Sequence, residues 1–317
     1  MRKACINHVY ELAKRDERVV FIGSDLGPGL LDEMKAEMPD RWYMEGVSEQ
    51  HCVGMAAGLA LEGYIPYFNT IATFITRRCF EQVAVDLCLH DLPVRLIGNG
   101  GGVVYAPLGP THLAIEDISI FRPLPNMTIF CAADADEMVR FMDTSLDWPH
   151  PIYIRLAKGG DPIVSSPEHG FEIGKGIVLR DEGPVLIIAM GAMVSRALDA
   201  AELLKARGIR CRVVNMHTVK PLDTGLVDEL AADSDLIVTC EEHVRTGGLG
   251  SAVIEHLSDS GQTGTPVLRL ALPDRFPTEY GSQDSMLETA GLQPPQLAAA
   301  IEVALSRTTA TGTGKAS

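Results

Sequence analysis

Positive charge is in short supply in this sequence. The 317 residues include 27 Lys and Arg against 42 Asp and Glu, so the formal net charge is −15 and the pI is about 5.0. A chain with this balance has no basic surface that could release counterions from a nucleic acid or bind an anionic bilayer. We therefore expect neither a nucleic acid nor a membrane as partner.

Paired cysteines and long apolar runs are also missing. The seven cysteines are scattered and none forms a C-x-x-C pair, so the sequence predicts neither a zinc site nor a dithiol redox motif, and no metal ligand is assigned. The longest apolar stretch, at about residues 184–194, is too short to cross a bilayer, and residues 1–8 turn polar too early for a signal peptide. These absences favour a cytoplasmic protein with buried, reduced thiols.

What the sequence does contain is an alternation of strand and helix patterns. With 46% hydrophobic residues and a length that suits two domains of about 100–200 residues, the chain can build large cores. Apolar strands are expected at residues 18–23, 65–68, 94–98, 127–132 and 152–155, and helices at 2–15, 51–61, 74–89 and 135–146. Strands that are apolar on both faces and separated by helices indicate a parallel sheet covered on both sides.

A second series of strands and helices follows a stretch without helical periodicity. Residues 158–183 contain Gly-Gly-Asp-Pro and Ser-Ser-Pro and are expected to form a linker. Further strands are expected at 185–190, 211–215, 236–240 and 267–271, with helices at 195–206 and 248–257. The predicted fold class is α/β with two mostly parallel sheets flanked by helices: a first domain at 1–160, a linker at 161–183 and a second domain at 184–317.

The most apolar of the expected helices begins with a carboxylate. Glu49 precedes a run of small apolar residues that ends at about Leu61. The charge could simply interact with the helix dipole, which contributes some tenths of a kcal/mol. A helix this apolar should however be buried, and a carboxylate carried inward with it tends to serve as a proton donor or shuttle. The residues alone leave both interpretations open.

Five segments, in fixed order, resemble the transketolase superfamily of thiamine diphosphate enzymes. The segments 45–61, 73–77 (Thr-Phe-Ile-Thr-Arg) and 109–117, which begins Gly-Pro-Thr-His, are similar to its pyrimidine-binding domain. The segments 216–223 and 247–251 are similar to its C-terminal domain. The resemblance extends to about residue 277, and it implies thiamine diphosphate as cofactor.

The resemblance implies a role for several residues at the cofactor. A glutamate at the position of Glu49 hydrogen-bonds a ring nitrogen of the aminopyrimidine and so promotes loss of the thiazolium proton, which makes Glu49 catalytic as well as cofactor-binding. Phe74 matches the aromatic residue that stacks on the pyrimidine. Asp25 matches an acidic residue of the same pocket, although a helix N-cap explains it almost as well. Arg77 resembles a cofactor-site arginine of deoxyxylulose-phosphate synthases, unless it pairs with Glu81 on one helix.

On the substrate side, the resemblance points to three residues. His112, in the Gly-Pro-Thr-His turn, matches a catalytic histidine that contacts the hydroxyl or oxyanion of the substrate. Arg2 and Arg155 match arginines that hold a sugar phosphate. An arginine at the end of a buried strand usually has an anionic partner, either in a ligand or in the protein.

One motif of the family is absent. Magnesium and the diphosphate are held there by Gly-Asp-Gly followed by Asn, whereas the only Gly-Asp of this chain, at residues 160–161, is followed by Pro162. The resemblance therefore implies that Mg²⁺ is bound mainly by a partner. That partner would be an N-terminal, diphosphate-binding transketolase subunit, in an α2β2 assembly that is active only when both chains are present.

The expected function is that of the C-terminal, β subunit of a transketolase that moves a two-carbon ketol unit from a ketose to an aldehyde. Alternatives are a β subunit of a 2-oxoacid-decarboxylating, acyl-transferring enzyme or of a deoxyxylulose-phosphate synthase-like enzyme, and a non-catalytic subunit. The Gly-Pro-Thr-His turn favours transketolases and deoxyxylulose-phosphate synthases. Leu108, Gly100 and Gly29 stand where an aspartate, a histidine and a serine are usual, so the sugar or sugar phosphate accepted should differ from that of ordinary transketolases.

Overall fold

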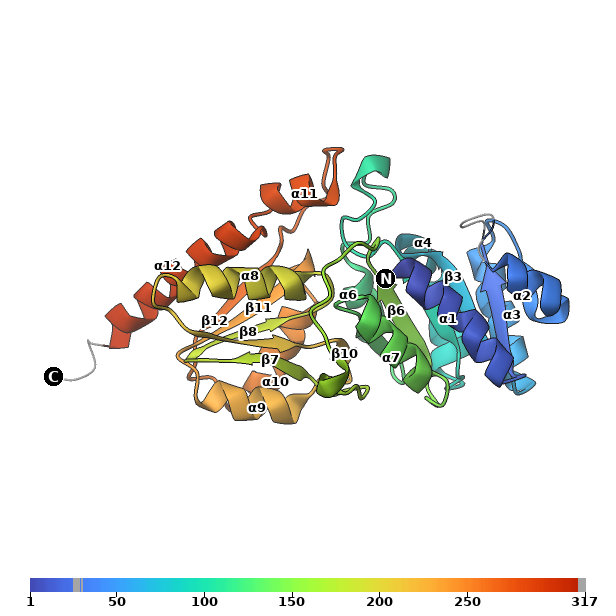
Figure 1. The fold of residues 1–317 in the computed structure, drawn as a ribbon, viewed down its shortest axis with the longest axis horizontal. Coiled ribbons are helices and arrows are strands. Elements are labelled where there is room, and N and C mark those ends of the chain that lie inside the picture. The colour runs from blue at the N-terminus through green and yellow to red at the C-terminus, as the bar shows by residue number, and fades with distance from the viewer. Residues whose placement is uncertain (25–28, 30, 313–317) are drawn as a thin grey trace.

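Two sheets, each covered by helices, lie side by side along the long axis of the molecule (Figure 1). The computed structural model describes the backbone of residues 1–24, 29 and 31–312, and the side chains of these residues up to Thr308. Within that part of the chain, the first sheet has seven strands in the order β10-β5-β6-β4-β3-β1-β2 and the second has five in the order β12-β11-β8-β9-β7. The two-domain α/β fold predicted from the sequence is confirmed.

The first sheet is parallel apart from one edge strand. Its strands are β1 (Val19–Gly23), β2 (Trp42–Met44), β3 (Ile65–Ile71), β4 (Arg95–Asn99), β5 (Thr128–Cys131), β6 (Ile152–Leu156) and the antiparallel β10 (Thr218–Lys220). Every residue of β1, β4, β5 and β6 is buried, as expected for strands covered on both faces.

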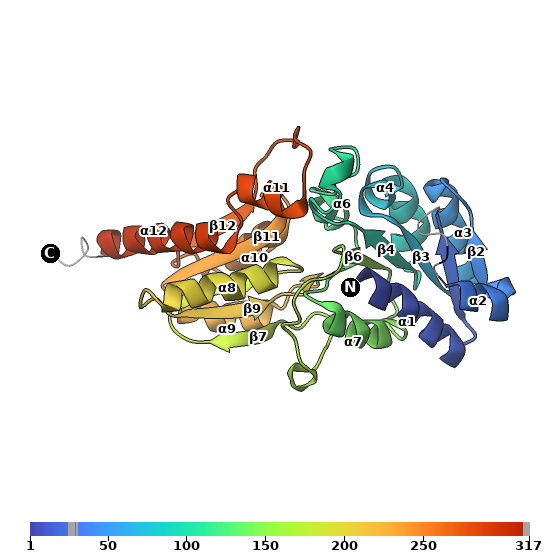
Figure 2. The same cartoon turned by 45° about the horizontal axis from the view of Figure 1, so that its top comes forward.

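Helices cover both faces of this sheet (Figure 2). The helices α1 (Arg2–Arg15) and α7 (Ala135–Ser145) pack together and share one apolar cluster with the sheet. A second cluster contains buried residues of α3 (Glu49–Leu61), α4 (Ala72–Arg77) and α6 (Asp117–Phe121). The short elements of this domain are α2 (Asp32–Glu37), η1 (Pro39–Arg41), α5 (Phe80–Gln82), the π-helical η2 (Val83–Cys88) and η3 (Ala106–Leu108).

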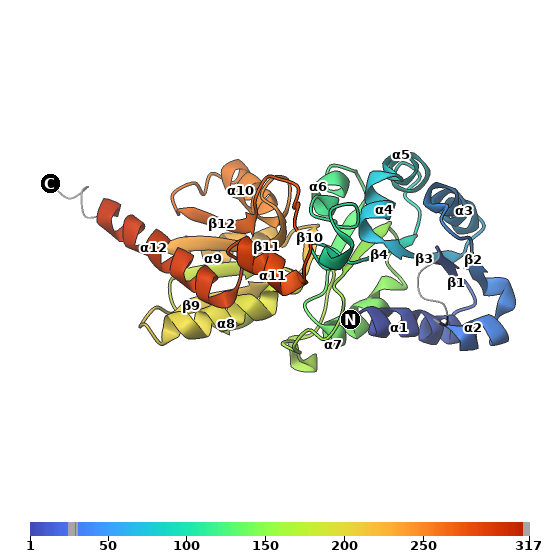
Figure 3. The ribbon, with the colours of Figure 1, turned by 90° about the horizontal axis from the view of Figure 1, so that it is seen from above.

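The second sheet is built in the same way (Figure 3). Its strands are β7 (Ile177–Asp181), β8 (Val185–Ala189), β9 (Cys211–Asn215), β11 (Leu236–Val244) and β12 (Val267–Leu272), and only β7 runs antiparallel to its neighbour. Its helices are α8 (Met193–Lys205), α9 (Thr224–Ala232), α10 (Leu249–Asp259), α11 (Gln283–Thr289) and α12 (Pro294–Gly312). Between the two domains the chain forms the short η4 (Pro167–His169).

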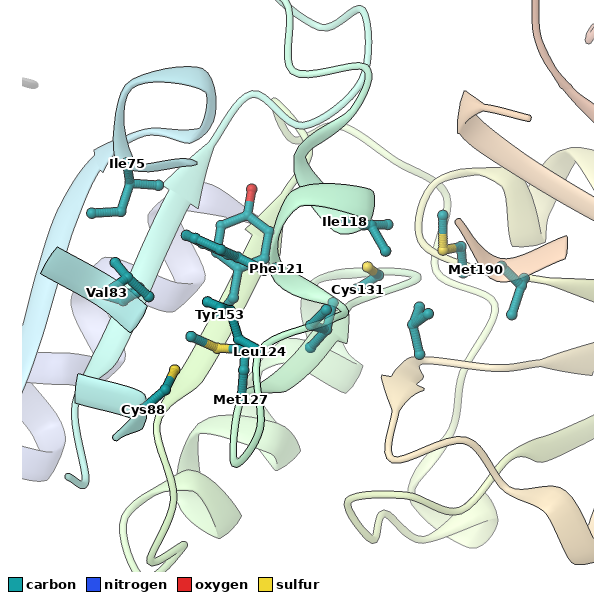
Figure 4. Packing of buried hydrophobic residues seen from close by; sticks show 14 of the residues in the cluster. Ile75, Val83, Cys88, Ile118, Phe121, Leu124, Met127, Cys131, Tyr153 and Met190 are labelled. Carbon is teal, nitrogen blue, oxygen red and sulfur yellow. The ribbon is translucent and has the colours of Figure 1, made fainter. Parts of the chain in front are cut away.

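The apolar core continues from one domain into the other. Ile118 and Phe121 of α6 and Tyr153 of β6 belong to the same buried cluster as Met190, which follows β8 (Figure 4). The edge strand β10, which follows β9 in the chain, returns to the first sheet and pairs with β5. The two domains are therefore joined by shared packing and by a strand as well as by the linker.

The structure differs from the expected organisation at β7 and along residues 74–89, and it adds β2, β10, α2, α6, α9, α11 and α12 to the expected elements. Strand β7 lies inside the segment expected to be a linker; its residues after Ile177 are only partly buried, so the apolar pattern that marks a strand is weak there. The helix expected at 74–89 is divided into α4, α5 and η2, although residues 74–89 contain no glycine or proline that would signal a break. As expected, the seven cysteines are unpaired and buried. No helix in the described ranges is both long and apolar enough to cross a membrane.

Candidate functional site

The buried carboxylate of Glu49 lies where the carboxyl ends of β1 and β3 meet. Glu49 is the first residue of α3 and its side chain is only 2% exposed. Its Oε1 atom accepts hydrogen bonds from Ser24 Oγ (3.3 Å), just beyond β1, and from Thr70 Oγ1 (3.4 Å) in β3. The two hydroxyls are also 2.9 Å from each other. The apolar helix thus carries the carboxylate inward, to the sheet edge at which ligands of parallel sheets bind.

The second oxygen of the carboxylate is paired with an arginine that the sequence analysis did not identify. Glu49 Oε2 accepts from Arg78 Nη1 at 3.0 Å, and the Arg78 guanidinium carbon lies 4.1 Å from the centre of the Phe74 ring. Phe74 and Arg78 are four residues apart, the spacing at which side chains on a helix become neighbours. This spacing can be read from the sequence, but it does not indicate a functional role for Arg78.

His112 completes a group of three side chains. Its ring lies 5.4 Å from that of Phe74 at an interplanar angle of 60°, and its Nδ1 is 2.9 Å from Thr111 Oγ1. His112 is half-buried, in the turn after η3. The fold therefore brings together three residues that are far apart in sequence: Glu49, Phe74 and His112. His112 lies beside Phe74, and Arg78 contacts both Phe74 and Glu49.

Arg77 binds the loop that leads into α6. Its Nε forms an ion pair with Glu116, and its Nη2 donates to the carbonyl of Leu113 at 3.1 Å. The alternative pairing with Glu81 is wrong, because α4 ends at Arg77 and the following residues do not continue the helix. A contact of Arg77 with the cofactor stays a prediction.

Arg155 is buried at the junction of the two domains. Its Nε donates to Asp117 Oδ2 (2.7 Å), and its Nη2 donates to Asp117 Oδ1 (3.2 Å), to the carbonyl of Ala114 (3.1 Å) and to the carbonyl of Glu242 (2.9 Å). Burial alone would lower the pKa of Arg155, but the Asp117 carboxylate, together with Cys131 and Tyr153, raises it above its ordinary value. The anionic partner expected for this arginine is thus in the protein, and its proposed contact with a sugar phosphate stays a prediction.

Arg2 lies close to the loop that follows β6. Arg2 is half-buried at the start of α1, and the backbone nitrogen of Met1 lies 3.4 Å from an ideal Cβ on Gly159, in the loop after β6. Arg2 is therefore at the same edge of the sheet as the end of β6, which carries Arg155. Asp25 lies outside the described residues.

Buried thiols beside the site are not nucleophiles. Cys79 Sγ donates to the carbonyl of Phe74 at 3.6 Å. Burial raises the pKa of Cys79 to about 12, with a further contribution from the charge of Glu49, and burial also raises the pKa of Cys52. Since the thiolate is the reactive form, the site is not suited to cysteine chemistry.

The residues present suit the aminopyrimidine of thiamine diphosphate. Two buried polar atoms, Thr73 Oγ1 beside Phe74 in α4 and Asn99 Oδ1 at the end of β4, have no hydrogen-bond partner in the described structure. Together with the carboxylate and the half-buried Phe74 ring, they offer hydrogen-bonding groups and a stacking face to a flat heterocycle. Within the described ranges, no group of three or more His, Cys, Asp and Glu side chains could hold a metal ion.

The three positions expected to alter substrate choice differ in their local structure. Gly100 has φ +77°, and an ideal Cβ there would lie 2.2 Å from Cε2 of Tyr105, so Tyr105 occupies the space that a side chain at position 100 would need. Gly29 has φ +87°. Leu108 is 50% exposed.

Comparison with known proteins gives consistent matches along the chain. A family model described as the transketolase pyrimidine binding domain matches residues 1–160, and one described as the transketolase C-terminal domain matches residues 174–297. The sequence is 40% identical over 292 residues to 1-deoxy-D-xylulose-5-phosphate synthase of Caldanaerobacter subterraneus subsp. tengcongensis, covering 91% of this chain and 46% of the relative. It is 39% identical over 301 residues to 1-deoxy-D-xylulose-5-phosphate synthase 1 of Geobacter sulfurreducens, covering 93% and 46%. The chain spans about half the length of the curated relatives it matches.

Solved structures add a match of nearly equal length. The fold is similar to that of a split-gene transketolase described as an inactive β4 tetramer, with a TM-score of 0.88 and 36% identity, covering 96% of this chain and 98% of that one. A transketolase of Pichia stipitis shares the fold at a TM-score of 0.79 and 20% identity, covering 99% of this chain and 46% of that one.

Proposed function

The chain belongs to the transketolase family, and from this premise we propose that it is the C-terminal, β subunit of a two-chain, thiamine diphosphate-dependent transketolase. The proposed reaction is the transfer of a two-carbon ketol unit from a ketose to an aldehyde. The observation that carries the proposal is the placement of the buried Glu49 carboxylate close to Phe74 and His112, at the carboxyl edge of a parallel sheet.

Each of the three side chains has a separate task in this proposal. Thiamine diphosphate, when bound, supplies a carbon nucleophile that no side chain can provide. Glu49 shares a proton with a ring nitrogen of the pyrimidine, in a pocket that the apolar α3 keeps dry. Phe74 stacks on the pyrimidine and fixes its plane. His112, half-buried beside Phe74, hydrogen-bonds the substrate oxygen on which negative charge develops.

An apolar surface along α3, the helix that begins at Glu49, supports the need for a partner. Buried residues of α3 face the sheet, but Leu61 at its end is 65% exposed, and Gly54 and Gly58 are exposed on the same side of the helix. Leu89, after the neighbouring η2, is 73% exposed. Exposed apolar patches of this kind mark interaction sites. We propose that the N-terminal, diphosphate-binding subunit covers this surface in an α2β2 complex and holds most of the Mg²⁺ ligands.

The likeness to a split-gene transketolase over 98% of its length supports the two-chain form, because the 1-deoxy-D-xylulose-5-phosphate synthases are matched over less than half of theirs. The description of that structure as inactive agrees with a β subunit that needs a partner. A second candidate is a two-chain enzyme of the deoxyxylulose-phosphate synthase type. It is favoured by the 40% identity to such a synthase and by the apolar, half-exposed Leu108 on the donor side.

Mixing the chain with its partner tests the proposal. Titration calorimetry should give no tight, magnesium-dependent binding of thiamine diphosphate to the chain alone, and tight binding once the N-terminal subunit is added. Ketol transfer should appear under the same conditions and not before. Tight binding and turnover by the chain alone would contradict the two-chain proposal.

A substrate panel separates the two candidates. Ketoses and 2-oxoacids serve as donors, and phosphorylated, sulfonated and unsubstituted aldehydes as acceptors, with specificity constants compared in the complex. Ketose donors with a weak preference for 5-phosphates support the transketolase proposal. Selective use of a 2-oxoacid donor would favour the synthase type.

A further inference from the structure

The guanidinium of Arg78 makes both of the contacts that the proposed function assigns to the pyrimidine. It lies 4.1 Å from the centre of the Phe74 ring, and its Nη1 donates to Glu49 Oε2 at 3.0 Å. A pyrimidine ring at this site would stack on the same ring and hydrogen-bond the same carboxylate. Guanidinium and pyrimidine are both flat groups that carry donors in their plane, so they would compete for one place.

We propose that Arg78 is a displaceable occupant of the pyrimidine site: it neutralises Glu49 and covers Phe74 in the free subunit, and it leaves both when the cofactor binds. The inference rests on the proposed function of Glu49 and Phe74. It makes Arg78 a positioning residue that sets the affinity for the cofactor, with no part in the bond-making steps.

The surroundings of Arg78 allow it to move. Its side chain is 42% exposed, whereas that of Glu49 is 2% exposed, so the arginine can turn into water while the carboxylate stays in place. Arg78 also follows the last residue of α4, at the point where the expected helix is interrupted. The adjacent Arg77 is held by Glu116 and by the carbonyl of Leu113 and is not placed to replace it.

The charge of Glu49 explains why the free subunit would keep such an arginine. An ionised carboxylate that is almost fully buried is costly without a partner. Among the described residues, its other oxygen receives two long hydrogen bonds, from Ser24 and Thr70. Arg78 stabilises the carboxylate until a ligand replaces it. Arg78 thereby weakens cofactor binding, because the apparent dissociation constant of the cofactor rises with the fraction of molecules in which Arg78 fills the site.

The test uses the reconstituted complex and measures the binding of thiamine diphosphate with Mg²⁺ by titration calorimetry. Arg78→Ala should bind the cofactor about tenfold more tightly than the wild type, and Arg78→Lys should lie between them because an ammonium stacks less well. Arg15→Ala is the matched control: Arg15 is also an exposed arginine paired with a carboxylate, Asp143, but at the far end of α1. Its affinity should equal that of the wild type. Unchanged or weaker binding by Arg78→Ala would overturn the inference.

Unfolding of the free chain gives a second readout. Arg78→Ala should lower the midpoint of denaturation, and the same substitution in a Glu49→Gln background should lower it much less, because no buried charge then needs a partner. Equal effects in the two backgrounds would overturn the stabilising role. Failure of the proposed function is distinguishable: in that case Phe74→Ala and Glu49→Gln would leave cofactor binding unchanged, whatever Arg78→Ala does.

Discussion

Removing the charge of Asp117 should destabilise the junction of the two domains more than most single substitutions do. Asp117 and Arg155 have side chains 0% and 8% exposed, and they form an ion pair at 2.7 Å. The same carboxylate accepts a hydrogen bond from the Tyr153 hydroxyl at 2.7 Å. Asp117→Asn keeps the size of the side chain and removes the carboxylate that pairs with Arg155. Among the described residues, the guanidinium would then be hydrogen-bonded to backbone carbonyls, with the more weakly interacting carboxylates of Glu241 and Glu242 still nearby.

The magnitude follows from the type of interaction. Breaking a buried ion pair by changing one partner costs about 3–5 kcal/mol, because the remaining charge is uncompensated. Arg155 would keep two backbone carbonyls, those of Ala114 and Glu242, so we expect the lower end, about 3 kcal/mol. The cost should appear as a lower midpoint of denaturation by urea, followed by circular dichroism.

A matched exposed pair gives the control. Asp143 forms an ion pair with Arg15 in which both side chains are about half exposed, 49% and 55%. Asp143→Asn should therefore change the free energy of unfolding by less than about 1 kcal/mol. If Asp117→Asn were no more destabilising than Asp143→Asn, Arg155 would not depend on this partner, and the reasoning from burial would be refuted.

Three further predictions concern acid–base behaviour, packing and the cofactor. Burial raises the pKa of Glu137 to about 7, so the protonated form is favoured in the folded chain. Relative to Glu137→Gln, the wild type should therefore lose up to about 3 kcal/mol of stability as the pH rises from about 4.5 to 7. Parallel curves of stability against pH for the two proteins would contradict this. Gly100→Ala should lower the free energy of unfolding by about 2–3 kcal/mol, because φ is +77° and the ring of Tyr105 fills the space; an unchanged urea midpoint would show that both can adjust. Phe74→Ala should weaken cofactor binding by the complex about tenfold, since stacking a flat ring on an aromatic side chain contributes about 1–3 kcal/mol; calorimetry giving the wild-type dissociation constant would exclude the stacking role.

The fold was largely predictable because buried parallel strands leave a strong pattern. Strand β1 is apolar throughout and β6 is apolar apart from Arg155; both were located within a residue at each end, and α1 was located at its full length. Elements that are only partly buried, such as β7, or that pair outside their own domain, such as β10, leave a weak pattern. The local sequence of a strand does not reveal pairing with a distant segment. Strands β7 and β10 were therefore not predicted.

The candidate site was less predictable, for a related reason. Glu49, Phe74 and His112 stand in motifs that resemble a known family, so they could be named from the sequence. The partners of arginines could not: Arg77 binds Glu116 instead of Glu81, Arg78 binds Glu49, and these pairs are 39 and 29 residues apart. A long arginine side chain pairs with whichever carboxylate the fold brings within its reach. Which carboxylate that is can be seen only in the structure.

In the proposed function, Glu49 of this chain activates a cofactor that is shared with a second subunit. The measurement that tests it most directly is exchange of the thiazolium proton of thiamine diphosphate for deuterium in the reconstituted complex, with wild-type chain and with Glu49→Gln. An amide cannot give up and recover a proton at the pyrimidine nitrogen, so Glu49→Gln should bind its partner normally yet slow the exchange by about 10²–10⁴-fold. Exchange at the wild-type rate in the Glu49→Gln complex would contradict the account and reduce Glu49 to a charge at the start of a helix.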